Sequence, residues 1–185
     1  MENSTSTLGW SYPFRPVLTF AMVVDISSDR VDPRLGAGID LFNQGDYYAC
    51  HDLLEAIWME AITLDKPFYQ GILQIAVGLY HLGNHNWQGA SILLGEGVNR
   101  LRPFEPSYGG VDVERLVDCG WAWLTALHQA GRDRVIEVAA VIPQAQGQAQ
   151  GKSALGLKPI EVAIAGIDPP LSLPALHIYP GAETT

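Results

Sequence analysis

The residue types best suited to chemistry gather in the stretch 43–58, NQGDYYACHDLLEAIW. His51 and Glu55 stand four residues apart, and Trp58 follows three residues later. Residues four apart share one face of a helix, so an imidazole and a carboxylate could act on one ligand as acid and base. The spacing is half of an H-E-x-x-H zinc motif, but the second histidine is missing.

A second set of polar residues lies in the largely apolar stretch 67–83. Gln70 and Gln74 are four residues apart, and His81 follows seven residues after Gln74, so the three share a helix face. Burying an amide without a partner costs about 1–3 kcal/mol, so these side chains need partners. The short break at 64–66 makes the two helices antiparallel neighbours.

Folding the chain at this break predicts a polar ladder between the two helices. The ladder joins His51 and Glu55 to Gln74 and His81. In the same pairing Trp58 lies over Gly71, where the missing side chain leaves room for an indole ring.

Three interpretations of the ladder remain open. It is a satisfied buried network that fixes helix register, a small polar pocket for a ligand or substrate, or a zinc site. The candidate catalytic residues are His51, Glu55 and His81, and the candidate ligand-binding residues are Trp58, Gln70 and Gln74. His51, Glu55 and His81 would be the zinc ligands. Because nothing in the sequence requires a metal, we predict no metal and no cofactor.

The elements that must position these residues are helices. Apolar residues at three- and four-residue steps, with Asp46 as an N-cap and Gly45 and Gly131 as stops, predict an all-α protein. We expect a compact bundle of about five helices with extended N- and C-terminal segments. The predicted helices cover residues 32–44, 46–63, 67–83, 86–101 and 112–130.

The chain divides into three parts by its pattern. We predict an N-terminal extension over 1–31 and a helical domain over 32–131. Residues 132–185 hold a short helix or strand, then the low-complexity linker 143–159, PQAQGQAQGKSALGLKP, and an extended, proline-punctuated tail. That tail either lies back across the helices or extends freely.

Composition narrows the class of partner. The 185 residues carry 20 acidic and 11 basic side chains, for a formal charge of −9. Without a basic cluster, contacts with nucleic acid and anionic membranes are disfavoured. There is no run of 18 apolar residues, and two cysteines in apolar stretches indicate buried reduced thiols. We therefore expect a cytoplasmic protein that binds an unknown protein or small molecule, with a homo-oligomer left open.

Several of these positions together resemble a family, the domain of unknown function three-hundred-and-nine. Its pattern is F-N-x-G-x-Y, then H-E-x-x-E-x-x-W, then a Q-G-x-x-Q helix and a G-A pair. The matching residues are Phe42, Asn43, Gly45 and Tyr47; His51, Glu55 and Trp58; Gln70, Gly71 and Gln74; Gly89 and Ala90. Asp52 departs from the family's glutamate. The resemblance covers about 34–102 and implies a compact all-helical domain, with no assigned activity.

Two functions are compatible with these residues. The first is a binding or structural module that uses the buried network to hold a small ligand or a partner protein. Helical hairpins often serve as such scaffolds. The alternative is a small metal-assisted or acid/base hydrolase built on His51, Glu55 and His81, which requires an open pocket at those side chains.

Overall fold

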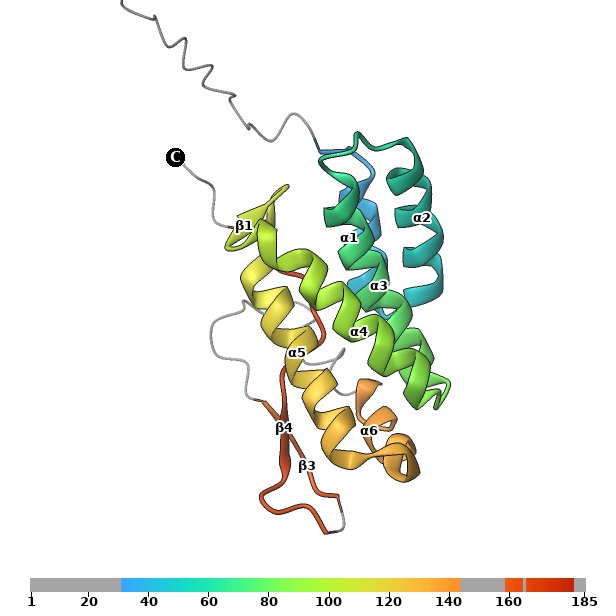
Figure 1. Ribbon diagram of the computed structural model, residues 1–185, viewed down its shortest axis with the longest axis vertical. Coiled ribbons are helices and arrows are strands. Elements are labelled where there is room, and N and C mark those ends of the chain that lie inside the picture. The colour runs from blue at the N-terminus through green and yellow to red at the C-terminus, as the bar shows by residue number, and fades with distance from the viewer. Residues whose placement is uncertain (1–30, 144–158, 165, 182–185) are drawn as a thin grey trace, which may run out of the picture.

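A computed structural model describes residues 31–143, 159–164 and 166–181 of the chain. The described part is all-α (Figure 1), as predicted, with only short antiparallel strand pairs beside the helices. Its helices are α1 (Leu35–Gln44), α2 (Tyr47–Glu60), α3 (Lys66–Gly83), α4 (Trp87–Leu101), α5 (Val113–Ala130) and α6 (Val135–Ala139). The segment after Gly131, which the sequence left open between helix and strand, forms the short helix α6.

Local sequence signals set most of the helix ends. Asp46, Asn86 and Asp112 each accept a hydrogen bond from the backbone N–H three residues later, and so cap α2, α4 and α5. Gly45 ends α1 in the left-handed conformation, with φ of 83°. Two predicted boundaries are wrong by three residues. Helix α1 begins at Leu35, and α2 ends at Glu60 because the backbone turns extended at residue 61.

Helix α3 lies between α2 and α4 (Figure 1), and ten of its 18 residues are buried. Its contact with α4 is unusually close, because glycines meet there. A Cβ atom added to Gly97 of α4 would lie 2.8 Å from the carbonyl oxygen of Gly71, and one added to Gly71 would lie 2.6 Å from Leu101 Cγ. The two backbones therefore approach each other more closely than larger residues would permit.

A short hairpin between α4 and α5 closes one end of the bundle. Its strands are β1 (Ser107–Tyr108) and β2 (Val111–Asp112). Tyr108 packs edge-on against Phe68, near the start of α3, with ring centroids 4.9 Å apart, and both rings contact Phe104. Aromatic contacts thus fix the hairpin to the first turn of α3.

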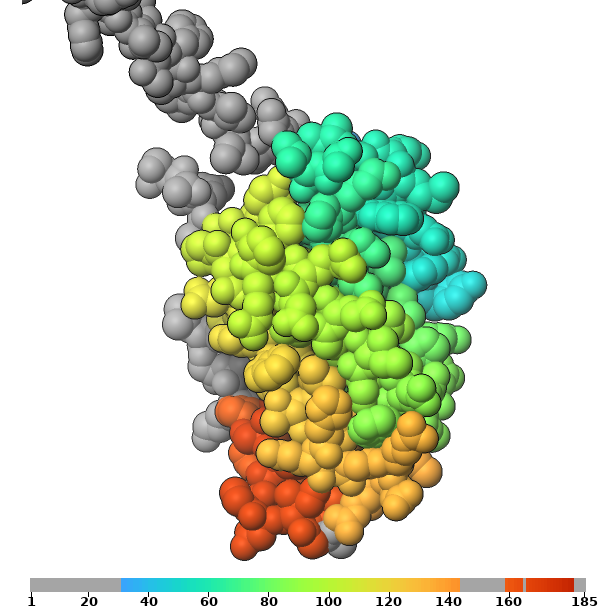
Figure 2. Space-filling model, viewed as in Figure 1, coloured from blue at the N-terminus to red at the C-terminus, as the bar shows by residue number. Residues whose placement is uncertain are grey.

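The C-terminal tail lies back across the helices. Strands β3 (Ile160–Val162) and β4 (Leu171–Leu173) pair antiparallel, and residues 174–181 continue in extended form to a bridge between Pro180 and Val111. Buried side chains of both strands join the core of the helices. In Figure 2 this strand pair lies at the opposite end of the molecule from the turn between α2 and α3.

Two predicted segments fall largely outside the described residues. These are the N-terminal extension 1–31, of which Val31 is described, and the linker 143–159, of which Pro143 and Pro159 are described. The division into three parts stays a prediction. Among the residues with assigned structure, none of the helices combines the length and the apolar character needed to cross a membrane.

Candidate functional site

The predicted pairing of α2 with α3 is correct in direction, but the predicted polar ladder is wrong. Tyr48 of α2 faces Tyr80 of α3 with ring centroids 5.8 Å apart, as an antiparallel hairpin requires. His51, however, contacts its own neighbour Asp52 at 3.0 Å between Nδ1 and Oδ1, and Glu55 is exposed to solvent. Neither side chain reaches the amide of Gln74.

Gln74 is buried as predicted, but its partners are on α4. Its Nε2 donates to Glu96 Oε2 at 2.6 Å, and its Oε1 accepts from Arg100 Nε at 2.9 Å. His81 also turns toward the start of α4, where its Nδ1 lies 3.2 Å from Asn86 Nδ2. The reason is the glycine contact between α3 and α4, which brings α4 within reach of these side chains.

Trp58 does not lie over Gly71, because Leu101 and Gly97 of α4 occupy the space beside that glycine. Instead the amino group of Lys66 lies 5.1 Å from the centre of the Trp58 ring, a cation–π contact. Gln70 is half-buried on α3. The predicted catalytic and ligand-binding residues are therefore spread over the α2–α3 and α3–α4 contacts, and the structure does not bring them into one site.

A cavity of about 330 Å³ opens at the turn between α2 and α3, at a place that no sequence motif marks. Its lining combines three acidic residues, a tyrosine and two apolar residues: Asp32, Glu60, Asp65, Tyr69, Ala61 and Ile62. The carboxylates come from three separate segments, namely the residues before α1, the end of α2 and the start of α3. We call this the acidic cavity.

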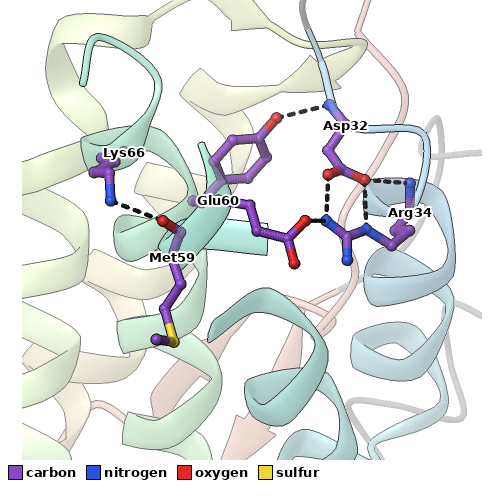
Figure 3. Close-up of polar contacts among 6 residues, drawn as sticks. Asp32, Arg34, Met59, Glu60 and Lys66 are labelled. Atoms are coloured by element: carbon purple, nitrogen blue, oxygen red, sulfur yellow. Dashed lines mark hydrogen bonds and ion pairs between the residues drawn. The ribbon is translucent and has the colours of Figure 1, made fainter. Parts of the chain in front are cut away.

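Two of the lining carboxylates, Asp32 and Glu60, belong to one ion-pair cluster (Figure 3). Arg34 binds Asp32 through two nitrogens, at 2.6 and 2.9 Å, and binds Glu60 at 2.7 Å. The hydrogen bond from Arg34 lowers the pKa of Asp32, so this carboxylate stays ionised. The Tyr69 hydroxyl accepts a hydrogen bond from the backbone N–H of Asp32 at 2.9 Å. Burial raises the pKa of the Tyr69 phenol.

Asp65 is the most buried carboxyl group of the acidic cavity, with 4% of its surface exposed. Its Oδ1 accepts the hydroxyl of Tyr108 at 2.6 Å, but among the described residues it forms no ion pair. Asp65 precedes the first residue of α3, but its side chain makes no capping bond. Its contact with Tyr108, 43 residues away, has no local sequence signal.

A second cavity, of about 160 Å³, lies between α5 and the tail. Arg115, Asp118 and Cys119 of α5 face His177 and Tyr179 of the tail across it. Burial lowers the pKa of His177, and the Nδ1 atom of this residue is buried without a hydrogen-bond partner in the described structure. From the sequence His177 is only a tail residue, because its neighbours on α5 are distant in the chain.

The two cysteines of the chain are buried thiols in the described structure. Cys50 and Cys119 are both buried and unpaired, and burial raises the pKa of each to about 12. Both are therefore thiols at neutral pH, which are poor nucleophiles. The described residues include no cluster of three His, Cys, Asp or Glu side chains arranged to hold a metal ion.

The described residues form an α-helical fold with an acidic cavity at the turn between α2 and α3 and a C-terminal tail bound to the helices. Residues 35–93 match the model of a family described as "Domain of unknown function (DUF309)", which confirms the resemblance seen in the motif. The chain is also 36% identical over 58 residues to "Uncharacterized protein YpuF" of Bacillus subtilis (strain 168). That alignment covers 31% of this chain and 33% of the relative. No solved structure matches the chain.

Proposed function

We propose that this protein is a non-catalytic binding module that holds a segment of a partner protein at the turn between α2 and α3. One observation carries the proposal. The acidic cavity opens directly beside large apolar side chains that are exposed to solvent, and Ile62 belongs to both features.

The apolar side chains concentrate at this turn. Met59, Ile62 and Leu64 are 68%, 53% and 72% exposed, and they lie within six residues of one another in the sequence. The other exposed large apolar side chains of the described residues are the contacting pair Tyr48 and Tyr80 and one residue on each of α4, α5 and α6. Apolar groups gathered at one exposed place are typical of protein-binding surfaces, because a partner removes them from water.

The charge of the cavity selects the partner. Arg34 neutralises part of the charge of Asp32 and Glu60, whereas Asp65 has no ion pair in the described structure. A carboxylate shielded from bulk water attracts a cation more strongly than an exposed one does. We therefore expect a partner segment with a lysine or arginine side chain that enters the cavity and apolar side chains that cover Ile62 and Leu64.

The volume of the cavity also suits this occupant. About 330 Å³ is near the lower limit for small-molecule sites, and it accommodates one basic side chain. A small cationic ligand would leave the exposed apolar side chains uncovered, so the apolar surface favours a protein segment. Neither described cavity is lined by His51, Glu55 or His81, so no observation here favours the hydrolase.

Peptide display against the full chain tests this proposal. We expect selected peptides to carry lysine or arginine beside apolar residues. Glu60→Gln and Asp65→Asn should each weaken their binding about 10-fold, the loss of one charged contact, and Leu64→Ser should weaken it by a similar factor. The control for Leu64→Ser is Ile136→Ser, which changes an isoleucine on α6 that is 60% exposed and should leave the affinity unchanged.

Two outcomes would contradict the proposal. One is a selection that enriches no basic, apolar pattern. The other is a set of folded cavity variants, with wild-type circular dichroism, that bind the selected peptides as well as the unchanged chain does. Glu60 is largely exposed, so its substitution keeps the test independent of folding.

A further inference from the structure

The tail accepts and donates hydrogen bonds through its backbone. Trp123 Nε1 donates to the carbonyl of Pro174 at 3.1 Å, and the Cys119 thiol donates to the carbonyl of Ala175 at 3.4 Å. Farther along, the backbone N–H of Asp112 donates to the carbonyl of Tyr179 at 3.0 Å. Such contacts depend on an extended backbone and not on which side chains the tail carries.

Asn43 is the central contact of the tail. Its Oδ1 accepts the backbone N–H of Ile178 at 2.7 Å, and its Nδ2 donates to the carbonyl of the same residue at 3.1 Å. One side chain thus satisfies both backbone groups of one residue, as a neighbouring strand would. Asn43 lies within the family match, 35–93, whereas the tail lies outside it.

Apolar side chains of the tail fill buried positions. Leu173, Leu176 and Ile178 are each exposed by 1% or less, so the tail presents the pattern Leu-x-x-Leu-x-Ile to the helices. With the backbone contacts, these three positions define a groove that recognises an extended peptide of this pattern. We call it the tail groove.

The tail does not fill its groove perfectly. The 160 Å³ cavity remains between it and α5. Next to this cavity His177 presents a buried Nδ1 without a partner in the described structure, while its Nε2 faces Asn43 Nδ2 at a long 3.4 Å. An unpartnered buried polar atom and an unfilled cavity both weaken binding, so a better occupant of the same groove is feasible.

We propose that the tail groove is a binding site for extended apolar peptides, and that the tail is its built-in occupant. A partner segment with the pattern Leu-x-x-Leu-x-Ile, and without a polar side chain at the position of His177, displaces the tail and takes over its contacts with Asn43, Cys119 and Trp123. This inference is independent of the proposed function at the acidic cavity.

The test uses the full chain with its tail weakened. Ile178→Asp places a carboxylate at a buried position and should release the tail, which leaves the groove free. A fluorescent peptide of residues 171–181, LSLPALHIYPG, should then bind at least about 10-fold more tightly than it binds the unchanged chain, where the attached tail competes at high effective concentration. Adding Asn43→Ala should weaken that binding about 10-fold, since two hydrogen bonds are lost.

Two control peptides sharpen the result. The peptide with Ile178→Asp should not bind, and the peptide with His177→Ala should bind more tightly than the unchanged peptide. If Ile178→Asp prevents folding, as judged by circular dichroism, Ile178→Ala replaces it. The proposal is overturned if the folded, tail-weakened chain shows no saturable binding, if the control peptide binds equally well, or if Asn43→Ala has no effect. Ile136→Ser, which changes an exposed side chain of α6 outside the cavity beside the tail, should leave all of these affinities unchanged.

Discussion

The contact between α3 and α4 and the contact between the tail and helices α1 and α5 hold the molecule together in different ways. The first depends on the absence of side chains, because Gly71 and Gly97 let the backbones of α3 and α4 approach directly. The second depends on single polar side chains, such as Asn43 and Trp123, that bind the backbone of an extended segment. The helix contact therefore tolerates little added volume, whereas the tail contact combines separate hydrogen bonds with buried apolar side chains.

Adding volume at the helix contact should have the largest effect. We expect Gly97→Ala to lower the free energy of unfolding by about 1–3 kcal/mol, since its Cβ would lie 2.8 Å from a backbone oxygen that cannot move aside. Denaturant unfolding measures the change. The matched control is Gly95→Ala on the same helix, where the added atom meets only Leu124 at 3.5 Å. A wild-type stability for Gly97→Ala would show that α3 and α4 are farther apart than described.

The amide of Gln74 should have the next largest effect. Removing it with Gln74→Ala should cost about 1 kcal/mol, because two hydrogen bonds to Glu96 and Arg100 are lost. A double-mutant cycle separates the observed contact from the predicted ladder. Gln74 and Glu96 should be coupled by a measurable energy, while Gln74 and Glu55 should not be coupled. Coupling of Gln74 to Glu55 and not to Glu96 would support the predicted ladder between α2 and α3.

The smallest effect should be the pH dependence contributed by the tail. Burial lowers the pKa of His177 below its usual 6.5, so the unfolded chain binds a proton at a higher pH than the folded chain does. The free energy of unfolding should therefore fall as the pH is lowered through 6.5, and the contribution should be complete above that pH. Denaturant unfolding at pH 7.5 and 5.5, compared between the wild type and His177→Gln, isolates this contribution. Equal pH dependence in the two proteins would contradict it.

The helices could be predicted from the sequence because their signals are local. Apolar residues recur at helical spacing. Asp46, Asn86 and Asp112 each cap a helix by accepting a hydrogen bond from the backbone N–H three residues later. The antiparallel direction of α2 and α3 followed from the short break between them. These features depend on residues that are close in the chain, so periodicity and capping rules can predict them.

The sites could not be predicted in the same way, because their partners are distant in the chain. The sequence showed that the amide of Gln74 needs a hydrogen-bond partner, but either α2 or α4 could supply it. The glycine contact brings α4 closer to α3, so the partner is Glu96 of α4. Asp65 meets Tyr108 across 43 residues, and Asn43 meets Ile178 across 135. Asn43 belongs to the family motif, yet its motif position carried no indication that it binds a backbone.

The β1–β2 hairpin touches both proposed sites. Its Tyr108 hydroxyl donates to Asp65 in the acidic cavity, while the backbone of Gly110 and Asp112 bonds the last described residues of the tail. Any ligand that shifts this hairpin when it displaces the tail would also alter the affinity of the acidic cavity. Thermodynamic linkage then requires reciprocity, so a partner in the acidic cavity would change the affinity of the tail groove by the same factor.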